Sequence, residues 1–105
     1  MRKRSGYVLG RSRENNLKYK LIRDGWMAFR LQGSAGGLPG PVKPIDVVAL
    51  KKGFTPRFFQ VSRHRSDISK KEKEELLRLA ELAGAEAMLA HLRKRRWVLE
   101  PLLTA

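Results

Sequence analysis

Four side chains of this sequence could together carry metal-assisted chemistry: Glu14, Asp46, Gln60 and Ser62. Asp46 lies in an otherwise apolar run, where an unpaired carboxylate is costly to bury. Gln60 and Ser62 stand two residues apart in a β-rich run, so strand alternation places both on one side of a sheet. A divalent cation would compensate the carboxylates, because Mg²⁺ prefers oxygen ligands and keeps waters available for a phosphate substrate. The set therefore predicts a metal site that acts on phosphate.

Each of these residues also has a structural explanation when taken alone. Asp46 could form an ion pair with Arg30 or Lys43, and Gln60 could hydrogen-bond to the backbone. The occurrence of all of them in one strongly basic chain favours the functional interpretation.

The first helix must position Glu14. Its predicted start is an N-cap at Ser12 and its predicted end is Asp24-Gly25. Helical spacing places Glu14 on or beside the inward face. That face is an apolar stripe formed by Leu17, Leu21 and Ile22.

Strand patterns and one further helix carry the other residues. Ser69 and Glu72 form a capping box that opens a helix ending at Gly84. The strands are predicted over 26–31, 45–50, 57–62, 86–91 and 96–100. The fold class is therefore α/β, with a central mixed five-stranded sheet flanked by helices in the order αβββαββ.

One domain is expected over residues 1–105. It would have a flexible basic N-terminus (about 1–10) and a mobile Gly/Pro loop (about 32–44). The glycines of this loop lack the strand and helix context of a nucleotide-binding motif, so they indicate flexibility.

Composition narrows the class of partner. The formal net charge of +13 predicts a polyanion, and nucleic acid is favoured over a membrane because no apolar run approaches the roughly 18 residues that span a bilayer. The absence of cysteine excludes disulfides, zinc knuckles and a thiol nucleophile. The N-terminus lacks the apolar segment of a secretory signal, so an intracellular protein is expected, in a prokaryotic cytoplasm or that of a viral host.

A family resemblance rests on two motifs and their surroundings. Pro44-Ile45-Asp46, then thirteen residues, then Gln60-Val61-Ser62 resembles the strand-turn-strand signature of the PD-(D/E)XK nuclease superfamily. More narrowly, residues 12–37 and 68–92 are similar to archaeal Holliday junction resolvases, and the similarity continues to the Trp97-Val98 strand. The sheet of these nucleases is restriction-endonuclease-like, in agreement with the predicted order of elements.

The resemblance implies roles for individual residues. Glu14 and Asp46 would bind Mg²⁺, or Mn²⁺ as a substitute, with the Gln60 amide oxygen and the Val61 carbonyl. Ser62 stands where the family has a lysine that orients the attacking water. A second metal ion could replace that lysine, another basic residue could do so, or the chain could be catalytically weak. The candidates are Arg63, His64, Lys43 and Lys71.

The implied activity is structure-selective endonuclease cleavage of four-way DNA junctions, with paired nicks made by a homodimer and no membrane or small-molecule cofactor. The apolar C-terminal residues 97–103 would either support the dimer or belong to the core. Two alternatives stay open: a non-catalytic nucleic-acid-binding protein of nuclease fold, and a nuclease for other branched or duplex DNA. Basic runs such as 93–96 would grip backbone phosphates. The predicted DNA-binding residues are Arg11, Arg13, Arg30, Ser34, Lys43, Arg63, His64, Arg65 and Lys71.

Overall fold

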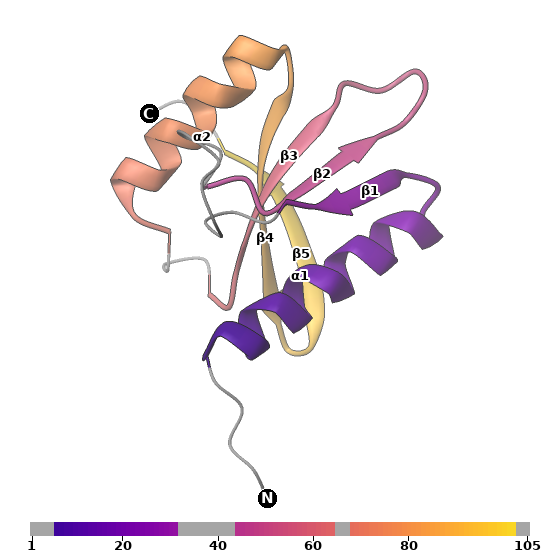
Figure 1. Cartoon of the computed structure of the whole chain (residues 1–105), viewed down its shortest axis with the longest axis vertical. Helices are drawn as coiled ribbons and strands as arrows, with labels where there is room; N and C mark the ends of the chain where they lie inside the picture. The colour runs from indigo at the N-terminus through magenta and orange to yellow at the C-terminus, as the bar shows by residue number, and fades with distance from the viewer. Residues whose placement is uncertain (1–5, 32–43, 65–67, 103–105) are drawn as a thin grey trace, which may run out of the picture.

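The computed structural model describes residues 6–31, 44–64 and 68–102, with side chains from residue 12 onward. The elements follow the predicted order αβββαββ (Figure 1). They are α1 (Gly6–Arg23), β1 (Met27–Arg30), β2 (Val47–Leu50), β3 (Arg57–Ser62), α2 (Lys70–Ala83), β4 (Glu86–Arg93) and β5 (Arg96–Pro101).

The five strands form one mixed sheet in the order β1-β2-β3-β4-β5. All neighbours are antiparallel except β3 and β4, which are parallel because α2 crosses over between them. Short turns suffice to join β2 to β3 and β4 to β5. The predicted mixed sheet flanked by helices is confirmed.

The helices cover opposite faces of the sheet, and strand alternation divides the core into two clusters. Leu17 and Leu21 of α1 pack with Val47 and Phe59, all of them fully or almost fully buried. On the other face, Leu76 and Ala80 of α2 pack with Ile45, Val48 and Ala87.

The start of α1 corrects one prediction. The helix begins at Gly6, so Ser12 lies inside it and is not its N-cap. No proline precedes Ser12 in this segment, and serine in a helix interior carries only a modest penalty, so the helix continues past the capping signal. Residues 6–10, predicted to be flexible, therefore belong to α1, while the predicted loop 32–44 lies almost wholly outside the described residues.

The far end of α1 follows the prediction, because Gly25 adopts φ 93 directly after the helix. The predicted apolar stripe holds at Leu17 and Leu21 but not at Ile22, which is 47% exposed.

Helix α2 has the caps that its sequence predicts. The Ser69 hydroxyl accepts a hydrogen bond from the Glu72 backbone N–H at 3.1 Å, and Gly84 adopts φ 66 at the C-terminal cap. Because both ends are defined by local chemistry, the predicted bounds are correct.

The C-terminal strand belongs to the core. Trp97 and Leu99 pack against the α1-side cluster, and Leu102 packs against the α2-side cluster. These residues are partly buried, so the described part of the tail contributes to the core, and its predicted role in a dimer stays a prediction. Neither described helix is long and apolar enough to cross a membrane.

Candidate active site

The predicted site residues meet at one end of the sheet, where β2 begins and β3 ends. Asp46 directly precedes β2, and both its backbone groups join the sheet: its N–H donates to the Phe59 carbonyl at 2.8 Å and its carbonyl accepts from the Leu31 N–H at 2.9 Å. Its side chain reaches β3, where Oδ2 accepts a hydrogen bond from the Val61 N–H at 2.8 Å. Asp46 is therefore held by backbone contacts on both sides.

The pKa of the Asp46 carboxyl is far above its ordinary value. Burial raises its pKa to about 7, against the lowering effect of the Val61 N–H, and the nearby carboxylates of Glu14 and Glu72 raise it further. No lysine or arginine among the described residues pairs with Asp46, so the predicted alternative of an ion pair with Arg30 does not form.

Arg30 instead faces Glu14. Its Nη1 lies 3.7 Å from Glu14 Oε1, and both side chains are about one-fifth exposed. Burial raises the pKa of Glu14, while the positive charges of Arg30 and Arg13 lower it. The first helix thus brings the Glu14 carboxylate and Arg13 to the end of the sheet that holds Asp46, where Arg30 ends β1.

Gln60 has one satisfied and one unsatisfied amide atom. Its Nε2 donates to Glu72 Oε2 at 2.7 Å, whereas its Oε1 is buried without a hydrogen-bond partner among the described residues. A buried acceptor without a donor is unfavourable, and a cation is one group that would satisfy it. Within the described part of the chain no three acidic or histidine side chains gather closely enough to bind a metal unaided, so such a site would need neutral oxygens.

Ser62 points to the same side of the sheet as Gln60, as alternation predicted, and both residues are buried. The Ser62 hydroxyl donates to the His64 carbonyl at 2.8 Å. In the parallel register Ser62 lies beside His91, whose Nε2 is 3.6 Å from Glu100 Oε2.

The structure describes three of the four predicted substitutes for the lysine, and two of them directly follow Ser62 in the chain. Arg63 and His64 are exposed directly after β3, and Lys71 is exposed in the first turn of α2. Lys43, Ser34 and Arg65 lie outside the described residues, and Arg11 is described only as part of the α1 backbone.

Two residues of this region were not predicted as part of the site. Glu72 was identified only as a capping residue, yet its second carboxylate oxygen holds the Gln60 amide. His91 becomes a neighbour of Ser62 only through the parallel pairing of β3 with β4. Capping was the only local signal for Glu72, because its contact with Gln60 depends on where α2 crosses the sheet.

The fold and the site define the class of protein. A mixed five-stranded sheet between helices, with an aspartate at the start of β2, a glutamate on α1 and a polar pair on β3, is a nuclease architecture of the restriction-endonuclease type. The model of the family described as archaeal Holliday junction resolvase (Hjc) matches residues 5–104. The chain belongs to this family of junction-resolving nucleases.

The solved structures that match include Hjc from Archaeoglobus fulgidus, a Holliday junction resolvase from an archaeal hyperthermophile. It shares 31% sequence identity with this chain and a TM-score of 0.73, over 89% of this chain and 77% of that one. A search of curated proteins finds no significant match.

Proposed function

We propose that this chain is a structure-selective DNA endonuclease that resolves four-way junctions by metal-dependent hydrolysis of phosphodiesters. The observation that carries this proposal is the pairing of Asp46, buried and held by the Val61 N–H, with the unsatisfied Gln60 Oε1 beside it. Membership of the family and the formal net charge of +13 support a DNA substrate.

The donor set fits a hard divalent cation such as Mg²⁺, with Mn²⁺ as a substitute. The proposed ligands are the carboxylates of Glu14 and Asp46, the Gln60 amide oxygen and the Val61 carbonyl. When bound, the ion would activate a water and neutralise charge on the phosphate oxygens.

Hydrogen bonds within the protein orient the side chains of Gln60 and Asp46. Glu72 accepts the Gln60 N–H and so fixes which end of the amide remains available. The Val61 N–H fixes the orientation of the Asp46 carboxylate. Arg30, close to Glu14 at this edge, is placed to contact a phosphate.

Ser62 cannot supply the positive charge of the lysine that it replaces. We assign that role to a neighbouring basic group, with Arg63, His64, Lys43 and Lys71 as candidates, or to a second metal ion. His91 is added to these candidates because it is the neighbour of Ser62 in the parallel register. On this assignment, Ser62→Lys does not increase the cleavage rate, and a large increase would contradict it.

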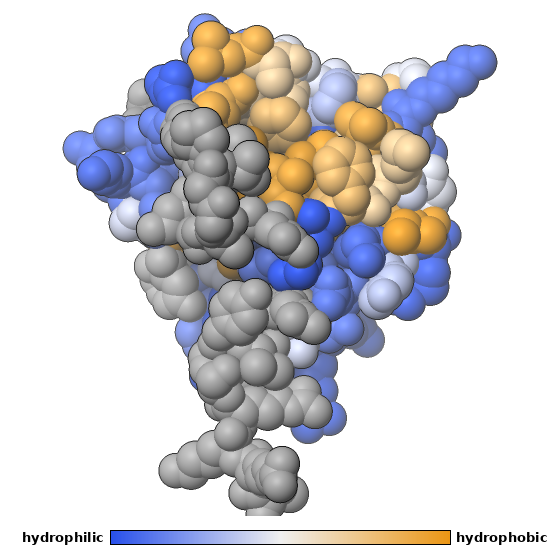
Figure 2. All heavy atoms as spheres, viewed as in Figure 1, coloured by the Kyte–Doolittle hydropathy of each residue, from blue (hydrophilic) through white to orange (hydrophobic). Residues whose placement is uncertain are grey.

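Paired nicks require two sites, which a homodimer would supply with the twofold symmetry of the junction. The surface that we propose for a second copy is the part of the sheet face that α2 leaves uncovered. There Met27 and Phe29 of the edge strand β1 are 66% and 40% exposed. Figure 2 shows apolar side chains gathered on this side of the molecule.

The decisive experiment compares the native protein with Asp46→Asn on a four-way junction and on a linear duplex of matching sequence, each with and without Mg²⁺ or Mn²⁺. Paired nicks in the junction alone, dependent on metal and lost in the variant by at least about a hundredfold, are the expected result. Equal cleavage of the duplex would contradict junction selectivity. Binding without cleavage under every condition would instead favour the non-catalytic DNA-binding alternative, for which Ser62 is the specific argument.

A further inference from the structure

The β4–β5 hairpin extends past the catalytic end of the sheet. Strand β4 runs parallel to β3 with Ser62 beside His91, and the hairpin turn follows at Lys94 and Arg95. At about 3.3 Å per residue, the tip lies roughly 10 Å beyond the row that contains Ser62. Figure 1 shows the hairpin at the same end of the sheet as the end of β3.

Four consecutive cations form this tip, and all are exposed: Arg93, Lys94, Arg95 and Arg96. Arg93 and Arg96 are directly opposite each other in the ladder, an arrangement that is unfavourable for like charges. Within the described part of the chain none of the four has an acidic partner, whereas Lys20, Arg30, Arg57 and Arg78 each do. The hairpin therefore concentrates unneutralised charge at one point.

The backbone of the turn is unfavourable for its residues. Lys94 and Arg95 have φ values of 49° and 65°, the geometry of a two-residue turn that Asn-Gly normally occupies. Neither residue type is favoured there, since a Cβ disfavours the left-handed region. The turn thus contains two long cationic side chains at positions where the backbone conformation favours asparagine and glycine.

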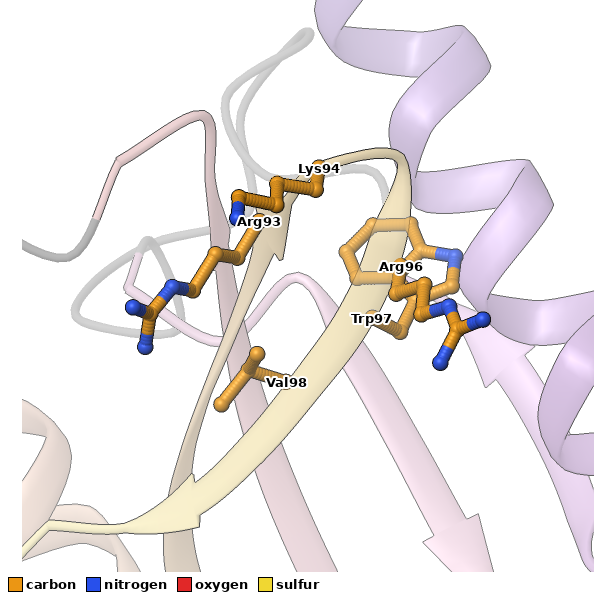
Figure 3. Close-up of a pocket in the computed structure, with 5 residues that line it drawn as sticks. All are labelled: Arg93, Lys94, Arg96, Trp97 and Val98. Atoms are coloured by element: carbon orange, nitrogen blue, oxygen red, sulfur yellow. The ribbon is translucent and has the colours of Figure 1, made fainter.

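A hollow lies beside the tip and combines charge with apolar surface. It has a volume of about 560 Å³ and is lined by Arg93, Lys94, Arg96, Trp97 and Val98. Figure 3 shows Arg93 and Arg96 extending to opposite sides of the hairpin, with Lys94 at the turn. Trp97 packs against the core, which anchors the hairpin. An apolar floor with a cationic rim suits a sugar–phosphate strand.

We propose that residues 93–96 form a second DNA-binding site, a rigid prong that binds backbone phosphates of the duplex arm beside the cut strand. This inference rests on the proposed function, because the position of the prong next to the catalytic end selects DNA among polyanions. It predicts binding that is independent of base sequence and of divalent metal.

The test is junction binding in EDTA across a range of salt concentrations. In Lys94→Asn/Arg95→Gly the turn receives its preferred residues while two charges are removed, so the protein folds and its melting temperature does not fall. Affinity at physiological salt is expected to drop about tenfold, and the slope of log affinity against log salt to decrease by about 2. Arg93→Gln/Arg96→Gln leaves the turn intact and is expected to reduce the slope similarly.

The matched control is Arg23→Gln/Lys52→Gln, which removes the same charge from two exposed positions at the opposite end of the sheet. If both hairpin variants bind with the slope and affinity of this control, the prong is refuted, while metal-dependent cleavage by the native protein would still support the proposed function. If the native protein binds junctions but does not cut them, the proposed function fails, and the same salt titration still tests the prong. Absence of junction binding by the native protein would refute both.

Discussion

At the scale of single residues, the site depends on how Gln60 is oriented. An amide has a donor and an acceptor of similar size, and only its partners determine which one faces a ligand. Glu72 can only accept while ionised, so it binds the amide N–H and directs the oxygen away from α2. In the proposed metal site, Glu72 would thus orient a neutral side chain so that its oxygen faces the metal, without touching the metal itself.

Replacing Glu72 tests this role. Glu72→Ala should weaken Mn²⁺ binding about tenfold to a hundredfold, because the Gln60 amide loses its fixed orientation. Isothermal titration calorimetry measures this affinity directly. Ser69→Ala is the control, because it removes the capping hydroxyl and its hydrogen bond to Glu72 Oε1 but leaves Glu72 Oε2 able to accept from the Gln60 amide. If both variants bind Mn²⁺ equally, Glu72 serves only as a cap.

The buried carboxyl of Asp46 predicts how stability depends on pH. Its pKa is raised from 3.8 to about 7 in the folded protein, so the folded state retains a proton that the unfolded chain releases. Protonation of Asp46 therefore stabilises the folded state fully below about pH 4, and this stabilisation is lost as the pH rises to about 7. At about 1.4 kcal/mol per pH unit, the free energy of unfolding falls by on the order of 4 kcal/mol.

Urea unfolding between pH 4 and pH 8 measures this effect. The free energy of unfolding should fall over that range in the native protein and change less in Asp46→Asn, which has no proton to lose. Mg²⁺ at pH 7.5 should restore stability to the native protein alone, since it binds the ionised carboxylate. An equal pH dependence in both proteins would contradict the raised pKa.

At the scale of elements, prediction from sequence succeeded where local chemistry determines the structure. The capping box at Ser69 and the glycine at 84 gave α2 correct bounds, and β-rich residues gave β3 correct bounds. It failed at the start of α1, because Ser12 can cap a helix or lie within one and no local feature decides between them. Ile22 was wrongly predicted to face the core, because the width of the buried face of a helix depends on how far the sheet extends beneath it.

The candidate site also has features that the sequence predicts and features that depend on packing. Asp46 and Gln60 could be identified from residue type and spacing along adjacent strands. The contacts of Gln60 with Glu72 and of Arg30 with Glu14 could not, because each depends on how a helix crosses the sheet. Sequence alone left Asp46 with Arg30 as a possible ion pair, and only the packed fold assigns Arg30 to Glu14.

At the scale of the whole molecule, a small domain with a net charge of +13 must both attract DNA and tolerate its own repulsion. Four consecutive exposed cations stand in the β4–β5 hairpin, at the end of the sheet that holds Asp46, while apolar residues remain exposed on β1. A DNA-binding face and a separate self-association face are compatible with this distribution.

The self-association face can be tested on β1. If the protein forms the proposed homodimer through β1, Met27→Glu/Phe29→Glu should convert it to a monomer at micromolar concentrations, because two exposed apolar side chains would become charged at the contact. Sedimentation velocity gives the mass in each case, and junction cleavage should change from paired to single nicks. Ile22→Glu, an equally accessible apolar residue on α1, should leave the mass unchanged. Identical masses for all three proteins would place the interface elsewhere.

The backbone of Asp46 has a consequence for motion. Its N–H is bonded to β3 and its carbonyl to the residue that follows β1, so Asp46 cannot move without opening the sheet on both sides. Local fluctuations concentrate where few such bonds exist, at exposed turns and side chains. Adjustment to a branched substrate is therefore expected of the exposed side chains around the site, while the buried Asp46 carboxylate keeps its position relative to the sheet.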